Sequence, residues 1–263
     1  MNKSTKYIIS YSIVAIYMIV SLSFIGRKSN EELCTVVEIN MVDSLNRLVV
    51  PRDITRLMEE KKQSIYGHPV SQINKMELSR LILTYNPLVQ DVGIYRAEGG
   101  TICMDIKSRK PILRVINKYG QGYYLDREGM IFPLSTHFSA RVLIANGDIL
   151  EQGYQNKAIH IDSMYSKFAA KRLTLQELLI LAKYIDSDEF LKAQIEQIYV
   201  VGNEYEMIPK VGSHIIVFGS IDNYVNKFFN LKAIYYKGFS NLGWQKYKSV
   251  NLKFDNQVIC TKR

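Results

Sequence analysis

The stretch 88–108, LVQDVGIYRAEGGTICMDIKS, decides the fold of the first half of this sequence. Near its end, Ile102, Met104 and Ile106 alternate with polar residues, which is the two-residue period of a strand with one buried face. The turn Glu98-Gly99-Gly100 separates this strand from an earlier β-rich segment. The stretch therefore predicts two consecutive strands joined by a tight turn.

Three elements before this stretch complete a small unit. Residues 35–42 alternate in the same way and predict a half-buried strand. Pro51 suits the first position of a helix, and Asn74 with Glu77 resembles a capping box that opens a second helix. The expected order is β-α-α-β-β, an α+β unit in which two helices cover one face of a sheet.

The sequence from about residue 114 onward is longer, mixed and β-rich. Tyr123–Asp126 and Met130–Phe132 flank a turn at Arg127-Glu128-Gly129, where the glycine supplies a positive φ. The other expected strands are Arg141–Ala145 closed by Asn146-Gly147, Ile195–Val201, Glu204–Ile208, His214–Phe218, and a final hairpin of Ser249–Phe254 and Gln257–Lys262.

Two helices are expected between these strands. Thr174 with Glu177 suggests a capping box for the first helix. Asp222 is expected to cap the second helix, which runs to Tyr236. The residues expected on the inward face of this second helix are Val225, Phe228, Phe229 and Ala233.

An uncharged apolar run near the start of the chain, Tyr7–Ile25 (YIISYSIVAIYMIVSLSFI), predicts a membrane anchor. At about 1.5 Å per residue, a helix of this length covers a hydrocarbon layer of about 30 Å. The alternative is a cleaved signal peptide with Lys3 and Lys6 as its basic region, but the run exceeds the usual apolar core of about 7–15 residues. We therefore expect an uncleaved, single-pass type II anchor with the bulk of the chain outside the cytoplasm.

Composition indicates a globular protein with a basic surface. Hydrophobic residues make up 47% and charged residues 22% of the sequence, and the net charge is +9. The basic residues are scattered without an arginine stripe, which favours an anionic membrane or an acidic partner over nucleic acid. Cys34, Cys103 and Cys260 are far apart and without metal-ligand spacing, so buried thiols are expected and a disulfide between two of them stays open.

The sequence offers no convergent catalytic, cofactor-binding or metal-binding motif. The four histidines lie in separate expected elements, without a histidine or cysteine neighbour at ligand spacing. Asp126 is the most tempting carboxylate, but its place before a hairpin turn gives it a structural explanation. We therefore expect a protein that is not an enzyme, needs no cofactor and works by binding.

The terminal hairpin is the element best suited to binding. A last strand often lies at a sheet edge, where its unpaired N–H and C=O groups can accept a strand from another protein. The alternative is that Gln257–Lys262 is merely paired and inert, with Lys262 and Arg263 as charges that guard the edge. The sequence leaves both interpretations open.

Four segments carry a family resemblance through their order and spacing. They are Ile106–Pro111 (IKSRKP), Tyr123–Pro133 (YYLDREGMIFP), Arg141–Gly147 (RVLIANG) and Ser249–Gln257 (SVNLKFDNQ). Together with the short tail, the apolar run and the β-α-α-β-β unit, they resemble the bacterial cell-division family FtsQ/DivIB, in particular its Bacteroidetes form. The resemblance covers nearly the whole chain.

This resemblance implies a domain plan and a role. The plan is a cytoplasmic tail (1–6), a transmembrane helix (7–25), a linker (26–33), a POTRA-like domain (34–113) and a β domain (114–263) ending in an edge hairpin. The implied role is a non-enzymatic inner-membrane scaffold of the divisome, with its bulk in the periplasm at the division septum. It would link early and late division proteins, with the POTRA-like domain contacting other divisome proteins.

The resemblance also implies a partner site at the C-terminal strands, where an FtsB/FtsL-like pair binds by strand addition. Ser249 and Cys260 stand where some relatives carry aromatic residues, which affects side-chain contacts more than backbone pairing. The implied partner-binding residues are Val250, Leu252, Lys253, Phe254, Asp255, Val258 and Ile259.

Two other classes of function compete with the division scaffold. A POTRA-containing component of an envelope secretion or assembly system is expected to carry several POTRA repeats, which the sequence lacks. A cell-wall enzyme would need a convergent acid, base or metal cluster, and the sequence offers none.

Overall fold

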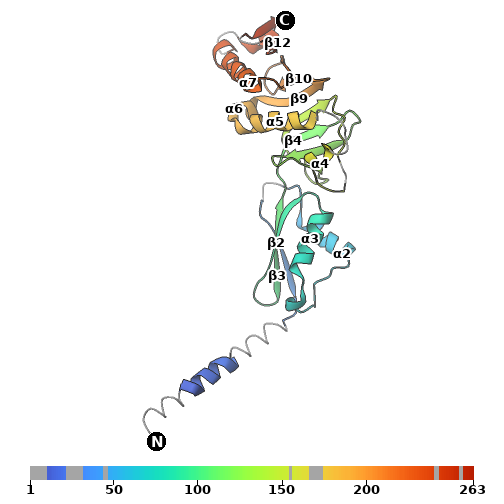
Figure 1. Ribbon diagram of the computed structural model, residues 1–263, viewed down its shortest axis with the longest axis vertical. Coiled ribbons are helices and arrows are strands. Elements are labelled where there is room, and N and C mark those ends of the chain that lie inside the picture. Colours follow the sequence, from blue (N-terminus) through green and yellow to red (C-terminus); the bar gives the residue numbers. More distant parts are fainter. Residues whose placement is uncertain are drawn as a thin grey trace. The chain divides into compact units, whose positions relative to one another are not determined.

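The structure is a computed structural model that describes residues 11–21, 32–43, 47–153, 156–165, 174–239, 243–254 and 257–263 (Figure 1). It contains two compact units. The first comprises the described residues of Met1–Ser44, Val50–Thr84 and Val89–Lys107. The second comprises those of Leu45–Val49, Tyr85–Leu88 and Ser108–Arg263.

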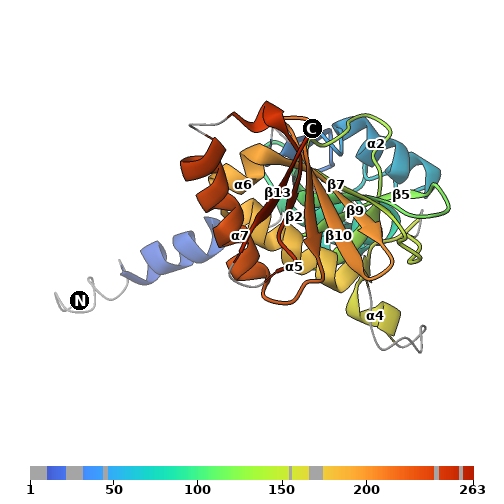
Figure 2. The same ribbon diagram turned by 90° about the horizontal axis from the view of Figure 1, so that it is seen from above.

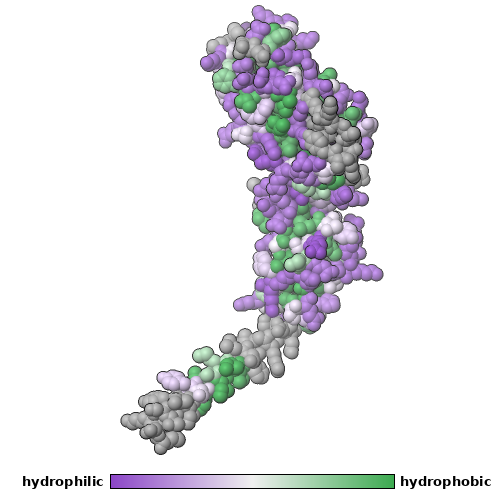
Figure 3. Space-filling view, in the orientation of Figure 1, coloured by the Kyte–Doolittle hydropathy of each residue, from purple (hydrophilic) through white to green (hydrophobic). Residues whose placement is uncertain are grey.

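Residues 11–21 form a helix whose apolar side chains are largely exposed (Figure 3). This helix covers the middle of the expected anchor Tyr7–Ile25. The ends of that anchor, the tail 1–6 and most of the linker 26–33 lie outside the described residues. None of the helices in the described ranges is both long enough and apolar enough to cross a bilayer.

The first unit has the predicted β-α-α-β-β order. Its elements are β1 (Val36–Met41), α2 (Pro51–Glu60), a 3-10 turn η1 (Val70–Gln72), α3 (Lys75–Tyr85), β2 (Val89–Arg96) and β3 (Thr101–Ser108). The sheet order is β1-β3-β2, with β1 parallel to β3. Ile102, Met104 and Ile106 of the central strand are completely buried, as their alternation predicted.

Local signals position the two helices of this unit. Pro51 is the first residue of α2, and the backbone N–H of Val50 donates to Asp53 Oδ2 at 3.0 Å. The predicted capping interaction of α3 is confirmed, because Asn74 Oδ1 accepts from the Glu77 N–H at 3.1 Å. Both helices therefore begin where the sequence indicated.

The second unit is built on one large sheet. Its strands are β4 (Pro111–Ile116), β5 (Gly122–Asp126), β6 (Met130–Pro133), β7 (Leu143–Gly147), β8 (Ile159–His160), β9 (Ile195–Val201), β10 (Glu204–Pro209), β11 (Ile215–Gly219), β12 (Tyr247–Asn251) and β13 (Ile259–Lys262). The order across the sheet is β13-β12-β11-β10-β9-β7-β4-β5-β6-β8. Strand β7 is parallel to both of its neighbours, and β11 is parallel to β12.

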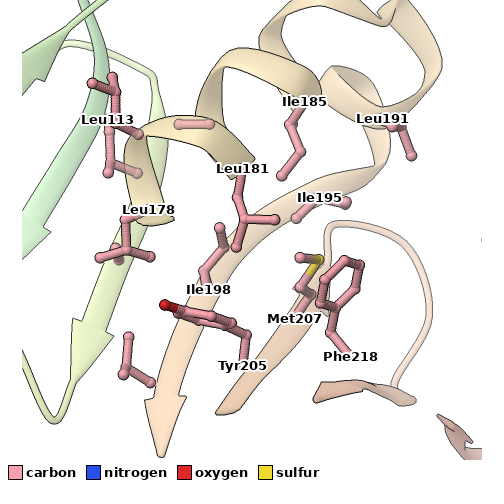
Figure 4. Packing of buried hydrophobic residues seen from close by; sticks show 14 of the residues in the cluster. Leu113, Leu178, Leu181, Ile185, Leu191, Ile195, Ile198, Tyr205, Met207 and Phe218 are labelled. Carbon is pink, nitrogen blue, oxygen red and sulfur yellow. The ribbon is translucent and has the colours of Figure 1, made fainter. Parts of the chain in front are cut away.

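Helices cover one face of this sheet (Figure 2). They are α4 (Asp162–Tyr165), α5 (Thr174–Ser187), α6 (Glu189–Gln194), α7 (Tyr224–Ala233), a π-helical turn η2 (Ile234–Phe239) and a 3-10 turn η3 (Trp244–Lys246). Leu181 and Ile185 of α5 point toward Ile198 and Met207 of the strands (Figure 4). This packing forms the main hydrophobic core of the unit.

A continuous row of cross-strand neighbours runs through the core face of the sheet from β5 to β13. Each side chain in the row is buried except the last, which is half-buried. In sheet order the row is Tyr123, Val115, Ala145, Ile198, Met207, Ile216, Val250 and Cys260.

Asp126 has the structural role that its position suggested. Its Oδ1 accepts from the N–H groups of Glu128 at 3.0 Å and Met130 at 2.8 Å, which closes the β5–β6 turn. Its Oδ2 lies 3.3 Å from Nη1 of Arg109. Burial raises the pKa of this carboxyl, and the Met130 N–H and Arg109 partly oppose that effect.

The sequence misplaced several features of the second unit. Asn146-Gly147 does not close the strand, because both residues belong to β7 and pair with β9. Helix α6 was not expected. The strand expected over Ser249–Phe254 spans Tyr247–Asn251 instead, and the turn at 255–256 lies outside the described residues.

The prediction of which α7 residues face inward was also wrong in part. Phe228 is buried, but Val225 and Phe229 are exposed, the latter by 70%. The helix begins at Tyr224, and its buried positions continue from Phe228 to Leu231. That spacing of three residues keeps one helical stripe in the core and places Val225 and Phe229 outside it.

Gly147 tests how tightly β7 is held between its neighbours. Its φ is +102°, and a Cβ added there would lie 2.3 Å from the carbonyl oxygen of Val200. We expect Gly147→Ala to lower the free energy of unfolding by about 3 kcal/mol or more, because backbone atoms of β9 would have to move. Urea denaturation of the full chain measures this change.

Gly202 offers the matched control. Its φ is also positive, at +57°, but a Cβ there would meet nothing within 4 Å. Gly202→Ala should therefore cost only about 1 kcal/mol, the strain of the left-handed conformation. Equal losses in the two variants would contradict the close approach of β7 to β9.

Candidate binding edge

The chain builds its C-terminal edge from a crossover followed by a hairpin. Parallel strands need a crossover connection, and the segment that contains α7 supplies it between β11 and β12. Strand β13 then returns antiparallel to β12. Because β13 is the last strand in the sheet order, its outer side pairs with no strand of the described chain.

The pairing direction of β13 shows which of its backbone groups face outward. The N–H of Arg263 donates to the carbonyl oxygen of Lys246 at 3.1 Å, so it points toward β12. Successive N–H groups of a strand alternate in direction. The N–H groups of Lys262 and Cys260 therefore point away from β12, at the open edge.

Two of the expected partner-binding residues belong to the core. Val250 is completely buried in the cross-strand row, and Leu252 is 3% exposed. The N–H of Leu252 also donates to Val217 at 2.9 Å, which extends the pairing of β12 with β11. The buried side chains of these two residues hold the hairpin in place.

The other expected residues lie differently. Phe254 and Ile259 are exposed by 46% and 43%, and Val258 is half-buried against the core. Lys253 Nζ lies 2.7 Å from a carboxylate oxygen of Glu204. Asp255 lies outside the described residues.

A hollow of about 410 Å³ lies beside this edge, between the helical crossover and the residues that precede β13. Ala233 and Ile234 line one side of it and Val258 the other. Tyr236 of η2 is exposed by 59%. The surface near the edge therefore combines backbone groups with apolar side chains, a combination that the sequence did not indicate.

His214 connects this edge to the core. The ring is buried, and its Nε2 lies 2.6 Å from the hydroxyl of Tyr235, which also accepts from Gln194 at 3.2 Å. Nδ1 of His214 has no hydrogen-bond partner within the described chain. Arg263 reaches the same corner, because its Nη2 donates to the carbonyl oxygen of Ser213 at 3.0 Å.

Burial shifts the acid–base behaviour of this group. It lowers the pKa of His214, and the positive charge of Arg263 lowers it further. Burial likewise raises the pKa of Tyr235 to about 12. Burial therefore favours the neutral forms of both His214 and Tyr235 in the folded protein.

The other three histidines lie apart from this corner. His68, His137 and His160 are outside the core, and the ring of His160 contacts the carbonyl oxygen of Glu128 at 2.9 Å. Within the described ranges no group of three or more His, Cys, Asp or Glu side chains is placed to hold a metal ion. The cysteines are free thiols, buried for Cys34 and Cys103 and half-buried for Cys260.

This α+β fold, with an open strand edge as its clearest candidate site, defines the structural class of the chain. Comparison with family models then specifies the class. A model described as FtsQ/DivIB, C-terminal related, matches residues 110–261, and a model described as a POTRA-like domain matches residues 32–107. No curated protein matches the chain.

The first match covers more than half of the sequence, so the chain belongs to the FtsQ/DivIB family. This confirms the family resemblance and the mixed α+β fold with a POTRA-like domain and a β-rich C-terminal part. Domains of this family suggest a non-enzymatic scaffold of the divisome, associated with the membrane at the division site.

The buried His214 predicts that stability depends on pH. Its pKa is lower in the folded state than its ordinary value of about 6.5, so the unfolded chain binds more protons below that pH. Its contribution is complete above about pH 6.5 and is lost as the pH falls toward the folded pKa. Between pH 7 and pH 5, wild type should lose more stability than His214→Gln.

The measurement is urea denaturation of both proteins across this pH range. His137→Gln, at an exposed histidine, is the matched control and should follow wild type. If His214→Gln and wild type lose the same free energy of unfolding between pH 7 and pH 5, protonation of His214 does not cause the loss.

The hairpin side chains should separate into two groups on substitution. Val250→Ala should lower the free energy of unfolding by about 1–3 kcal/mol, because it removes buried methyl groups from the cross-strand row. Ile259→Ala should change it by no more than about 0.5 kcal/mol, because that side chain is exposed. Thermal denaturation distinguishes the two, and similar losses would contradict this assignment of core and surface.

Proposed function

We propose that the chain is a bitopic membrane scaffold of the divisome that links early and late division proteins at the septum. In this proposal Tyr7–Ile25 is the anchor, the two units lie in the periplasm and β13 binds an FtsB/FtsL-like pair by strand addition. The POTRA-like domain contacts other divisome proteins. The observation that carries the proposal is the open outer side of β13 in a family whose domains suggest a division scaffold.

The chemistry of the edge supports backbone recognition. An added strand would meet the outward N–H groups of Cys260 and Lys262, and each new hydrogen bond contributes about 0.5–1.5 kcal/mol. Ile259 and Phe254 add exposed apolar surface on the same hairpin. Since Val250 and Leu252 are in the core, partner specificity would come from the exposed side chains and the neighbouring hollow.

Lys262 offers a direct test of backbone pairing. Lys262→Pro removes an outward N–H and adds a ring at the edge, while the pairing of β13 with β12 keeps its own N–H groups. We expect at least tenfold weaker binding of the purified FtsB/FtsL-like pair, measured by biolayer interferometry with the full chain in nanodiscs. Lys262→Ala, which keeps the N–H, should bind within about twofold of wild type.

Photo-crosslinking in dividing cells locates the partner independently. A crosslinker at Phe254 or Ile259 should capture an FtsB/FtsL-like protein, whereas one at Tyr119, exposed by 62% on the β4–β5 turn, should not. If Lys262→Pro and Lys262→Ala weaken binding equally, or if Ile259 captures no division protein while the chain stays folded, strand addition at this edge is wrong.

A further inference from the structure

A second hollow in the large sheet lies away from the C-terminal edge. It is a groove of about 660 Å³, within the range of about 300–1,000 Å³ that ligand sites occupy. Its walls come from the first residues of β4 and β9, and the segment before β7 forms its rim. Ala182 and Ile185 of α5 also line it.

The groove exists because β7 starts late. The register pairs Leu143, the first residue of β7, with Leu113 on one side, and Ile144 with Gln197 on the other. Leu143 therefore lies between Leu113 and Glu196, and no β7 residue lies between the first two residues of β4, Pro111 and Ile112, and the first residue of β9, Ile195. Two strand spacings separate β4 from β9, roughly 9.5 Å, and one strand is missing from that width.

An extended peptide fits a gap of this kind. Its side chains would alternate between the two faces of the sheet, as those of β7 do farther along. On the helix-covered face they would meet Ala182 and Ile185, which are both buried and apolar. The peptide side chains that point to this face should therefore be aliphatic.

The opposite face of the groove carries positive charge. Arg114 lies between the buried Leu113 and Val115, so it points to the face away from α5. Its Nη1 donates to Ser139 Oγ at 3.0 Å, and its Nε is buried without a hydrogen-bond partner in the described chain. Arg141 is exposed on the rim of the same groove.

Lys210 and Lys192 complete the basic lining, and they differ in their partners. Lys192 Nζ lies 2.6 Å from Asp186, which Arg127 also contacts at 2.7 Å. Lys210 Nζ donates instead to the carbonyl oxygen of Lys192 at 3.1 Å. Asp186 is therefore already neutralised by two cations.

Three cations of the groove have no carboxylate partner among the described residues, and these are Arg114, Arg141 and Lys210. One carboxylate on the lining, that of Glu196, opposes them. The lining thus keeps an excess of positive charge over an apolar floor. A partner with carboxylates on one face and aliphatic groups on the other complements both surfaces.

We propose that this groove binds an extended acidic segment of a partner protein, in which aliphatic and acidic residues alternate. The aliphatic side chains enter the gap left by β7 and contact Ala182 and Ile185. The carboxylates meet Arg114 on the other face, and Arg141 and Lys210 where they line the groove. This site is separate from the β13 edge and does not depend on strand addition there.

The test uses the full chain in nanodiscs and a fluorescein-labelled peptide of alternating residues, Glu-Leu-Glu-Val-Glu-Leu-Glu-Val-Glu. Fluorescence anisotropy should give saturable binding that weakens at least tenfold in the double variant Arg141→Glu/Lys210→Glu. Both side chains are exposed, so the fold should tolerate the reversal. Arg52→Glu/Lys75→Glu, the same charge change at exposed sites of the first unit, should stay within twofold of wild type.

A second peptide and a crosslinker test the position of the ligand. Replacing Leu and Val by Ser in the peptide should also weaken binding at least tenfold, because serine side chains lack the apolar groups that contact Ala182 and Ile185. In wild type, a photo-crosslinker at Val142 on the rim should capture the first peptide, and one at Val201, exposed on β9, should not.

Three binding results would overturn the proposal. They are no binding of the alternating peptide to wild type, equal loss of affinity in the two charge-reversal pairs, and equal affinity for the serine peptide. The last two results would mean attraction to a basic protein surface rather than recognition by the groove. Capture from Val201 instead of Val142 would likewise place the peptide elsewhere.

Discussion

The core-face row from Tyr123 to Cys260 is the constraint on which the second unit depends. Each of its members pairs with the next across a strand boundary, and α5, α6 and α7 cover the row from one side. A shift of any strand by one residue would expose its buried side chains, so the row fixes the register of all these strands together. Both candidate sites follow from that alignment. The row ends at β13, whose outer side is the open edge. Strand β7 is shorter than its neighbours β4 and β9, and the groove lies where it is missing.

The sequence predicted what is local in this structure. Alternation identified the buried face of β3, and Asn74 with Glu77 identified the start of α3, because both signals lie within a few neighbouring residues. The strand pattern of the second unit was also largely predicted. The inward face of α7 was not, since Val225 and Phe229 are as apolar as Phe228 and only packing on the sheet decides between them.

Long-range features were beyond the reach of sequence patterns. Asn146-Gly147 has the composition of a turn, yet both residues lie in a strand because β9 pairs with them. The expected site contained Val250 and Leu252 together with Phe254 and Ile259, and only the folded hairpin separates core from surface among them. The basic groove was also missed. Arg114, Arg141 and Lys210 are scattered along a chain of net charge +9, and nothing local shows that they converge.

The pleat of β13 restricts any strand that adds to it. The residue opposite Cys260 would continue the core-face row and lie on the side covered by helices, near the hollow beside η2. The residues opposite Ile259 and Thr261 would lie on the bare side of the sheet. The edge therefore selects partners in two ways. A partner must pair with the backbone of β13, and its apolar residues must occupy the alternate positions that face the helix-covered side. A sequence displaced by one position would keep its hydrogen bonds and bury the wrong half of its side chains.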